Sequence, residues 1–174
     1  MNTALRAGAG ALVIAAAVSG LVLSGARAAM TPHVAADDPI AAGRFLVNYG
    51  GCNDCHTGGQ LEGQPLPPES GRLEGSTVGF MGPWGVSYAP NLRMVLASMS
   101  PAQFTALIAN PGPMGKPPMP WPALQSLSQA DQLAIYAYIH SLGPAGTMTP
   151  ADVAPGADPT TPYIRFTPVM PGSH

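Results

Sequence analysis

The two cysteines of this chain lie three positions apart, and a histidine directly follows the second: Cys52-Asn53-Asp54-Cys55-His56. A spacer of two residues lets one tight turn present both sulfur atoms on the same side, with the imidazole next to them. Because the 174 residues contain no other cysteine, the chain cannot build a disulfide framework. The fold must therefore accommodate one compact turn that carries two thiols and an imidazole.

This spacing is the attachment signature for a covalently bound haem. The two thiols can add to the two vinyl groups of one haem, and a neutral imidazole suits iron as an axial ligand. The alternatives are a thioredoxin-like redox pair, a structural disulfide and half of a zinc site. The first requires a βαβ unit, which the sequence does not suggest, and the last requires more ligands. We predict one haem c, attached through Cys52 and Cys55, with His56 as an axial ligand.

The first 28 residues have the pattern of an export signal. Arg6 supplies a positive start, residues 7–23 are apolar, and Ala26-Arg27-Ala28 fits a cleavage site. We expect residues 1–28 to be a cleaved signal peptide and the mature protein to lie in the periplasm. The alternative is an uncleaved membrane anchor, because about 17 apolar residues approach the shortest span of a bilayer. A membrane is an expected partner only in that case.

The composition indicates where the chain folds. Only 9% of the residues are charged and the net charge is −2, so a nucleic-acid partner is not expected. Glycine and proline number 21 each, which predicts long irregular segments. We expect a flexible N-terminus at residues 29–36, one domain at 37–144 and a Pro-rich disordered tail at 145–174.

Three segments of the domain carry helix signals. Asp37-Asp38-Pro39 begins the first helix, and Gly50-Gly51 ends it. Ser100 opens a capping box before a shorter helix that ends at Asn110-Pro111, and Ser128 caps a final helix that ends at Gly143-Pro144. The apolar faces expected for the first and last helices are Ala42, Phe45, Leu46 and Tyr49, and Ile135, Tyr138, Ile139 and Leu142.

The stretch from residue 57 to residue 99 has no sustained periodicity. We interpret it as a long loop, and a loop of this length needs a ligand to organise it. The fold class predicted is all-α, with three to four short helices and long loops wrapped around one covalently attached haem.

The second axial ligand is expected in the segment Lys116-Pro117-Pro118-Met119-Pro120-Trp121. Methionine is a soft ligand that suits iron, and the prolines leave the backbone little freedom to lose when the ligand binds. Met81 and Met114 are less favoured alternatives. His140 lies beside the apolar stripe of the last helix, and we expect it to be a solvated surface residue.

In this order, the segments resemble a class I c-type cytochrome over the whole predicted domain. More narrowly, they resemble the cytochrome c domains in the cytochrome subunits of bacterial alcohol and aldehyde dehydrogenases. The residues that carry the narrower resemblance are Gly43–Leu46, Cys52–His56, Gly82–Asn91, Pro118–Pro120 and Ala137–Leu142.

The resemblance implies roles for individual residues. Met119 would be the distal ligand, and the carbonyl of Pro90 would accept a hydrogen bond from Nδ1–H of His56, which leaves Nε2 for iron. Trp84, Tyr88 and Trp121 would line the haem pocket or donate to a propionate, although they could equally be ordinary core residues.

The function expected is one-electron transfer between a periplasmic dehydrogenase and a downstream acceptor such as a terminal oxidase. With both axial positions occupied, the protein would be an electron carrier and not an enzyme. The alternative is a haem-based sensor or enzyme in which the sixth ligand is displaced.

Overall fold

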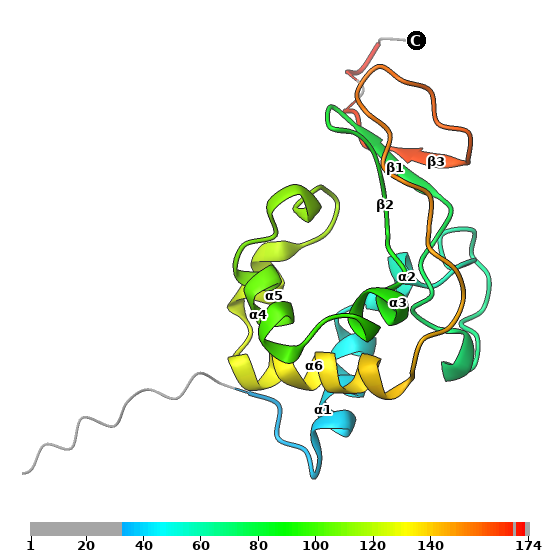
Figure 1. Ribbon diagram of the computed structural model, residues 1–174. Coiled ribbons are helices and arrows are strands. Elements are labelled where there is room, and N and C mark those ends of the chain that lie inside the picture. Colours follow the sequence, from blue (N-terminus) through cyan, green and yellow to red (C-terminus); the bar gives the residue numbers. More distant parts are fainter. Residues whose placement is uncertain (1–32, 169, 173–174) are drawn as a thin grey trace, which may run out of the picture. The chain divides into compact units, whose positions relative to one another are not determined.

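The computed structural model describes residues 33–168 and 170–172 (Figure 1). The predicted signal peptide and its cleavage site lie outside the described residues. The elements of the described part, in chain order, are α1 (Pro39–Tyr49), α2 (Cys52–His56), η1 (Glu69–Gly71), β1 (Gly79–Gly82), β2 (Gly85–Tyr88), α3 (Leu92–Ala97), α4 (Pro101–Ala109), η2 (Gly112–Met114), α5 (Trp121–Ser126), α6 (Gln129–Ser141) and β3 (Tyr163–Arg165). None of these helices is long and apolar enough to cross a membrane.

Helices α1, α4 and α6 start where the sequence predicts. The side chain of Asp38 accepts from the backbone N–H of Ala41 at 2.8 Å, and Pro39 follows it as the first helical residue of α1. Ser100 forms the complete capping box with Gln103 at the start of α4. Ser128 caps α6 by accepting from the backbone N–H of Asp131 at 3.1 Å.

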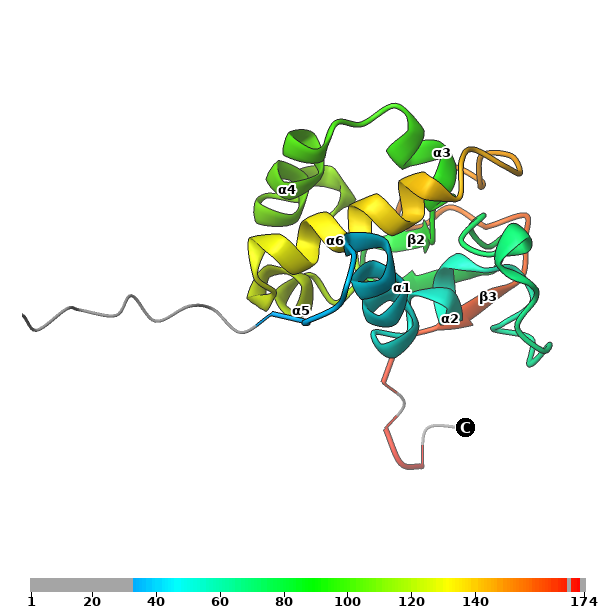
Figure 2. The same cartoon turned by 90° about the horizontal axis from the view of Figure 1, so that it is seen from below.

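Helices α1 and α6 cross at the centre of the core (Figures 1 and 2). They approach so closely at Gly43 that a Cβ there would lie 2.0 Å from the backbone oxygen of Ala134. Any larger residue would push the two helices apart. The buried side chains around this crossing include Leu46, Val47, Ile135, Tyr138 and Ile139.

Half of the apolar face predicted for α1 is wrong. Phe45 and Tyr49 are exposed, with relative exposures of 53% and 82%, and their rings stack on each other with centroids 5.6 Å apart. The buried face instead consists of Ala42, Gly43, Leu46 and Val47. Because α1 approaches α6 closely at Gly43, the side of α1 that carries Gly43 faces the core. For α6 the predicted stripe is correct at Ile135, Tyr138 and Ile139, which are buried, whereas Leu142 follows the helix and is only partly buried; His140 is exposed as expected.

The all-α prediction needs correction, because the described part contains a small sheet as well as six α-helices. Strands β1 and β2 form an antiparallel hairpin with Gly82 opposite Gly85, and β3 adds in parallel on the other edge of β1. The residues expected to form one long loop therefore contain a hairpin, and α3 as well. Four-residue strands that begin or end with glycine are too short to produce a visible sequence period.

The prediction of a disordered tail at residues 145–174 is also wrong for most of its length. Beyond α6 the chain returns along the hairpin, where Val153 and Val86 exchange two backbone hydrogen bonds of 2.9 Å, and then forms β3 (Figure 1). The ring of Phe166 packs against Phe80 and Trp84 at centroid distances of 5.8 and 6.5 Å. Prolines are compatible with this path because a single-stranded segment on a sheet edge needs few backbone N–H donors.

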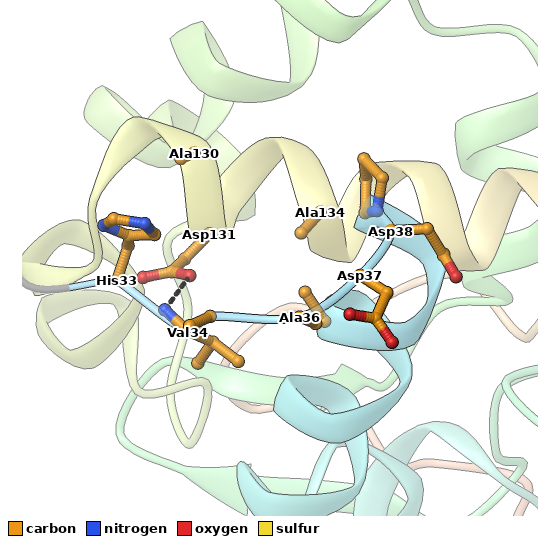
Figure 3. Close-up of a pocket in the computed structure, with 11 residues that line it drawn as sticks. His33, Val34, Ala36, Asp37, Asp38, Ala130, Asp131 and Ala134 are labelled. Atoms are coloured by element: carbon orange, nitrogen blue, oxygen red, sulfur yellow. Dashed lines mark hydrogen bonds between the residues drawn. The ribbon is translucent and has the colours of Figure 1, made fainter.

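Residues 33–36, expected to be flexible, run beside the first turns of α6. The backbone N–H of Val34 donates to Asp131 at 2.8 Å, as the dashed line in Figure 3 marks. A shallow cavity lies between this segment and α6, and it is lined mostly by alanine and aspartate residues. None of the predicted site residues lines this cavity.

Candidate functional site

The five-residue motif forms a helix of its own, α2, directly after α1. Gly51 has φ of +67°, so the chain turns through the left-handed region between the two helices. The backbone N–H of Asp54 donates to the carbonyl of Gly51 at 3.0 Å. Both thiols are free and half-buried, and Cys52 packs against the core. The sequence therefore places two thiols and one imidazole on little more than one helical turn.

His56 is buried, with a relative exposure of 6%, and its ring is held by a distant part of the chain. Nδ1 lies 2.9 Å from the carbonyl oxygen of Pro90. Because a carbonyl oxygen only accepts, Nδ1 must carry the proton, and Nε2 of a neutral ring has a free lone pair. Burial lowers the pKa of His56, although the hydrogen bond to Pro90 partly opposes this, so the ring is neutral at pH 7.

The position of Pro90 depends on Leu73, a residue that sequence analysis did not single out. Leu73 is fully buried and has φ of +61°, which is strained for a residue with a branched side chain. In this conformation its carbonyl accepts from the backbone N–H groups of Leu92 and Arg93 at 3.0 and 3.4 Å. Its own N–H donates to Oγ1 of Thr57, the residue after His56, at 3.0 Å. Leu73 thus connects the segment after His56 to the segment after Pro90.

Comparisons of the chain with protein-family models, with curated proteins and with solved structures find no match.

The two thiols do not have the environment of a redox-active pair. Burial is the main cause that raises the pKa of Cys52 to about 11; a backbone hydrogen bond opposes this rise, and the nearby carboxylate of Asp54 adds a smaller increase. Burial and Asp54 raise the pKa of Cys55 as well. A thioredoxin-like cysteine needs the opposite shift, because only the thiolate attacks a disulfide. Within the described ranges, no three His, Cys, Asp or Glu side chains are grouped so that they could hold a metal ion.

Met119 lies in the proline-rich loop between η2 and α5, and it is half-buried. The carbonyl of Met119 accepts from the backbone N–H of Trp121 at 2.9 Å. Two residues earlier, the carbonyl of Pro117 accepts from Oγ of Ser87 on β2 at 2.6 Å. The alternatives differ in setting: Met114 is exposed, whereas Met81 belongs to the central strand β1.

The three aromatic candidates differ in the hydrogen bonds that their side chains make. Nε1 of Trp84 donates to the carbonyl of Phe80 at 3.1 Å, and the hydroxyl of Tyr88 bonds to Oγ1 of Thr161 at 2.7 Å. Nε1 of Trp121 is buried and has no hydrogen-bond partner among the described residues. Buried donors are almost always paired, so this N–H is suited to an acceptor that the polypeptide does not supply. Trp84 lies in the turn between β1 and β2 and Tyr88 ends β2, whereas Trp121 packs against the helical core, as Cys52 does.

Proposed function

We propose that the protein is a mono-haem c-type cytochrome with a cytochrome c fold, which carries single electrons in the periplasm between a dehydrogenase and a downstream acceptor. The observation that carries the proposal is the buried His56 ring, whose Nδ1 lies 2.9 Å from the Pro90 carbonyl, one residue after a pair of free thiols. This is the arrangement that a haem-ligating histidine requires, because a fixed tautomer directs the other nitrogen to the metal.

The residues present fit the haem that the motif implies. Cys52 and Cys55 would form the two thioethers, and His56 would bind iron through Nε2. Trp121 would donate its unpaired buried N–H to a propionate, which supplies the missing acceptor. When bound, the haem supplies reversible one-electron chemistry. With Met119 as the second axial ligand, no iron position would be open to a substrate, which favours an electron carrier over the sensor or enzyme.

Haem staining on a denaturing gel tests the proposal. The full chain, expressed with export and haem attachment, should stain, whereas the Cys52→Ala/Cys55→Ala double variant should not. Asp54→Asn is the matched control, because it changes the same helix and leaves both thiols in place. Stain of equal intensity in the double variant would refute covalent attachment. A stained protein with a high-spin oxidised spectrum would support the sensor or enzyme instead.

A further inference from the structure

The segment of residues 145–153, which follows α6 after residues 142–144, contacts both parts of the chain that would supply axial ligands. We propose that this segment, the brace, holds the Met119 loop in its ligating position, with Asp152 as the positioning residue. The inference rests on the proposed function, since it concerns how the second axial ligand is kept in place.

The first half of the brace packs against the His56 side. The side-chain amide of Asn91 has no exposed surface, and its Nδ2 donates to the carbonyls of Ala145 and Thr147 at 2.8 and 3.0 Å. Thr149 then lies so close to Gly75 that a Cβ on this glycine would be 2.3 Å from the threonine methyl. Gly75 itself donates its backbone N–H to the carbonyl of His56 at 2.7 Å. This end of the brace is therefore fixed by the segments that flank the His56–Pro90 contact.

The second half of the brace reaches the Met119 loop. One carboxylate oxygen of Asp152 accepts from the backbone N–H of Tyr88 at 3.2 Å, and the other accepts from Nζ of Lys116 at 2.7 Å. Lys116 is three residues before Met119, and the next residue, Pro117, is bonded to Ser87 of the same hairpin. Asp152 therefore joins the Met119 loop to the brace and to β2 at once.

The loop has few other anchors, because its prolines lack N–H donors. The Lys116–Asp152 pair is about one-third exposed on each side, so it contributes little to global stability. Opening of one loop is a local equilibrium, however, and a single anchor can change its population without unfolding the domain. Loss of Asp152 should therefore affect the release of Met119 far more than the unfolding of the protein.

The test is the affinity of the oxidised haem protein for imidazole at pH 7 and low ionic strength. Imidazole can bind iron only when Met119 leaves, so its apparent affinity measures loop opening. Asp152→Asn keeps the shape but removes the charge, and it should tighten imidazole binding by about twofold to fivefold, the range of one partly exposed ion pair. Glu69→Gln is the matched control. It weakens the Arg44–Glu69 pair, which has the same 2.7 Å separation and similar exposure but connects α1 to η1, and the hydrogen bond that Glu69 accepts from Tyr138 of α6; neither contact involves the Met119 loop. Because this pair lies away from the Met119 loop, Glu69→Gln should change the imidazole affinity by less than about twofold.

Lys116→Met completes a double-mutant cycle. If the pair acts as inferred, Lys116→Met and Asp152→Asn should each tighten imidazole binding, and the double variant should bind no tighter than the stronger single variant. Equal effects of Asp152→Asn and Glu69→Gln, or fully additive effects of the two brace variants, would overturn the inference.

Amide hydrogen exchange separates this inference from the proposed function. The N–H of Trp121, which bonds to Met119, should exchange faster in Asp152→Asn than in Glu69→Gln whether or not methionine binds iron. If the wild-type protein lacks a methionine-to-iron charge-transfer band, the ligand assignment fails, and exchange still decides whether Asp152 holds the loop. Equal exchange in the two variants would overturn the brace.

Discussion

Nδ1 of His56 lies 2.9 Å from the carbonyl oxygen of Pro90, although 34 positions separate the two residues in the chain. Between them the chain forms the η1 turn and the whole β1–β2 hairpin, and it still returns to the imidazole. Such a return requires a specific anchor, and the buried, strained Leu73 provides it by bonding to the segments after both residues. The orientation of the ring is therefore a property of the tertiary fold, whereas the presence of the ring beside two thiols is local.

With Met119 as the proposed second axial ligand, its replacement by Ala should open the proposed haem iron to water and to added imidazole. The oxidised protein should lose its methionine-to-iron band and become partly high-spin. Its reduction potential should fall by on the order of 0.1 V, well within the range of about 0.8 V that axial ligands set. Met81→Ala and Met114→Ala serve as controls and should keep the band, as absorption spectroscopy and redox titration will report. Loss of the band in either control, with Met119→Ala unchanged, would reassign the ligand.

Replacement of Trp121 by Phe removes one buried N–H and keeps most of the ring. If a propionate accepts from Nε1, the haem-loaded variant should lose about 1.5–3 kcal/mol of unfolding free energy, the value of a hydrogen bond to a charged group. Urea denaturation of the variant and the wild-type protein, analysed with the same m-value, measures the difference in unfolding free energy. Trp84→Phe loses a bond to a neutral carbonyl and should cost about 0.5–1.5 kcal/mol. A neutral or stabilised Trp121→Phe would mean that this N–H lacks an acceptor in the haem protein too.

Glu69 gives the fold a dependence on acid pH. Burial raises the pKa of its carboxyl, but hydrogen bonds from Arg44 and Tyr138 lower it by more, so the net pKa is below its ordinary value. The lowered pKa means that the carboxylate contributes stability above about pH 4.3, its unfolded pKa, and loses it as the pH falls through the folded pKa.

Glu69→Gln should consequently be slightly less stable than wild type at pH 7, and the two should converge below pH 4. The difference should be small and should shrink with salt, because the side chains of Arg44 and Glu69 are both more than one-third exposed. Urea midpoints of both proteins at a series of pH values measure it. A gap that persists unchanged at low pH would show that the carboxylate charge is not the cause.

The features that were predicted correctly from sequence depend on neighbours in the chain. Asp38, Ser100 and Ser128 cap their helices through bonds to residues only three positions away, so the pattern contains all the information. The proposed attachment motif is local in the same sense. The interpretation of residues 145–168 failed for the opposite reason. Their partners are Val86, Tyr88 and Phe80, far back in the sequence, and a segment without periodicity gives no sign of such partners.

The site residues divide in the same way. Trp121, Trp84 and Tyr88 were equivalent as sequence candidates, and only the tertiary structure shows that Trp121 alone has an unpaired N–H. No sequence feature pointed to Leu73, because leucine rarely adopts the left-handed backbone conformation that this residue has in the structure.

The last prediction concerns docking to a redox partner. The described residues include five Lys and Arg, and three of them, Arg44, Arg93 and Lys116, are paired with carboxylates within the protein. A nearby carboxylate weakens the long-range electrostatic field of each paired cation. Exposed charges are in any case screened beyond about 10 Å at 0.1 M salt. Helix α1, directly before the attachment motif, instead exposes two stacked aromatic rings, Phe45 and Tyr49.

Docking is therefore expected to use a small, weakly apolar contact, of the transient kind typical of redox pairs. The bimolecular electron-transfer rate with a natural partner, measured by stopped flow, should change by less than about tenfold between low and high salt, because long-range steering is weak. Phe45→Ser/Tyr49→Ser should slow the reaction at every salt concentration, whereas Met148→Ser, an exposed apolar residue of the brace, should not. A steep decrease of the rate with salt in the wild-type protein, or an unchanged rate in the α1 variant, would contradict this mode of docking.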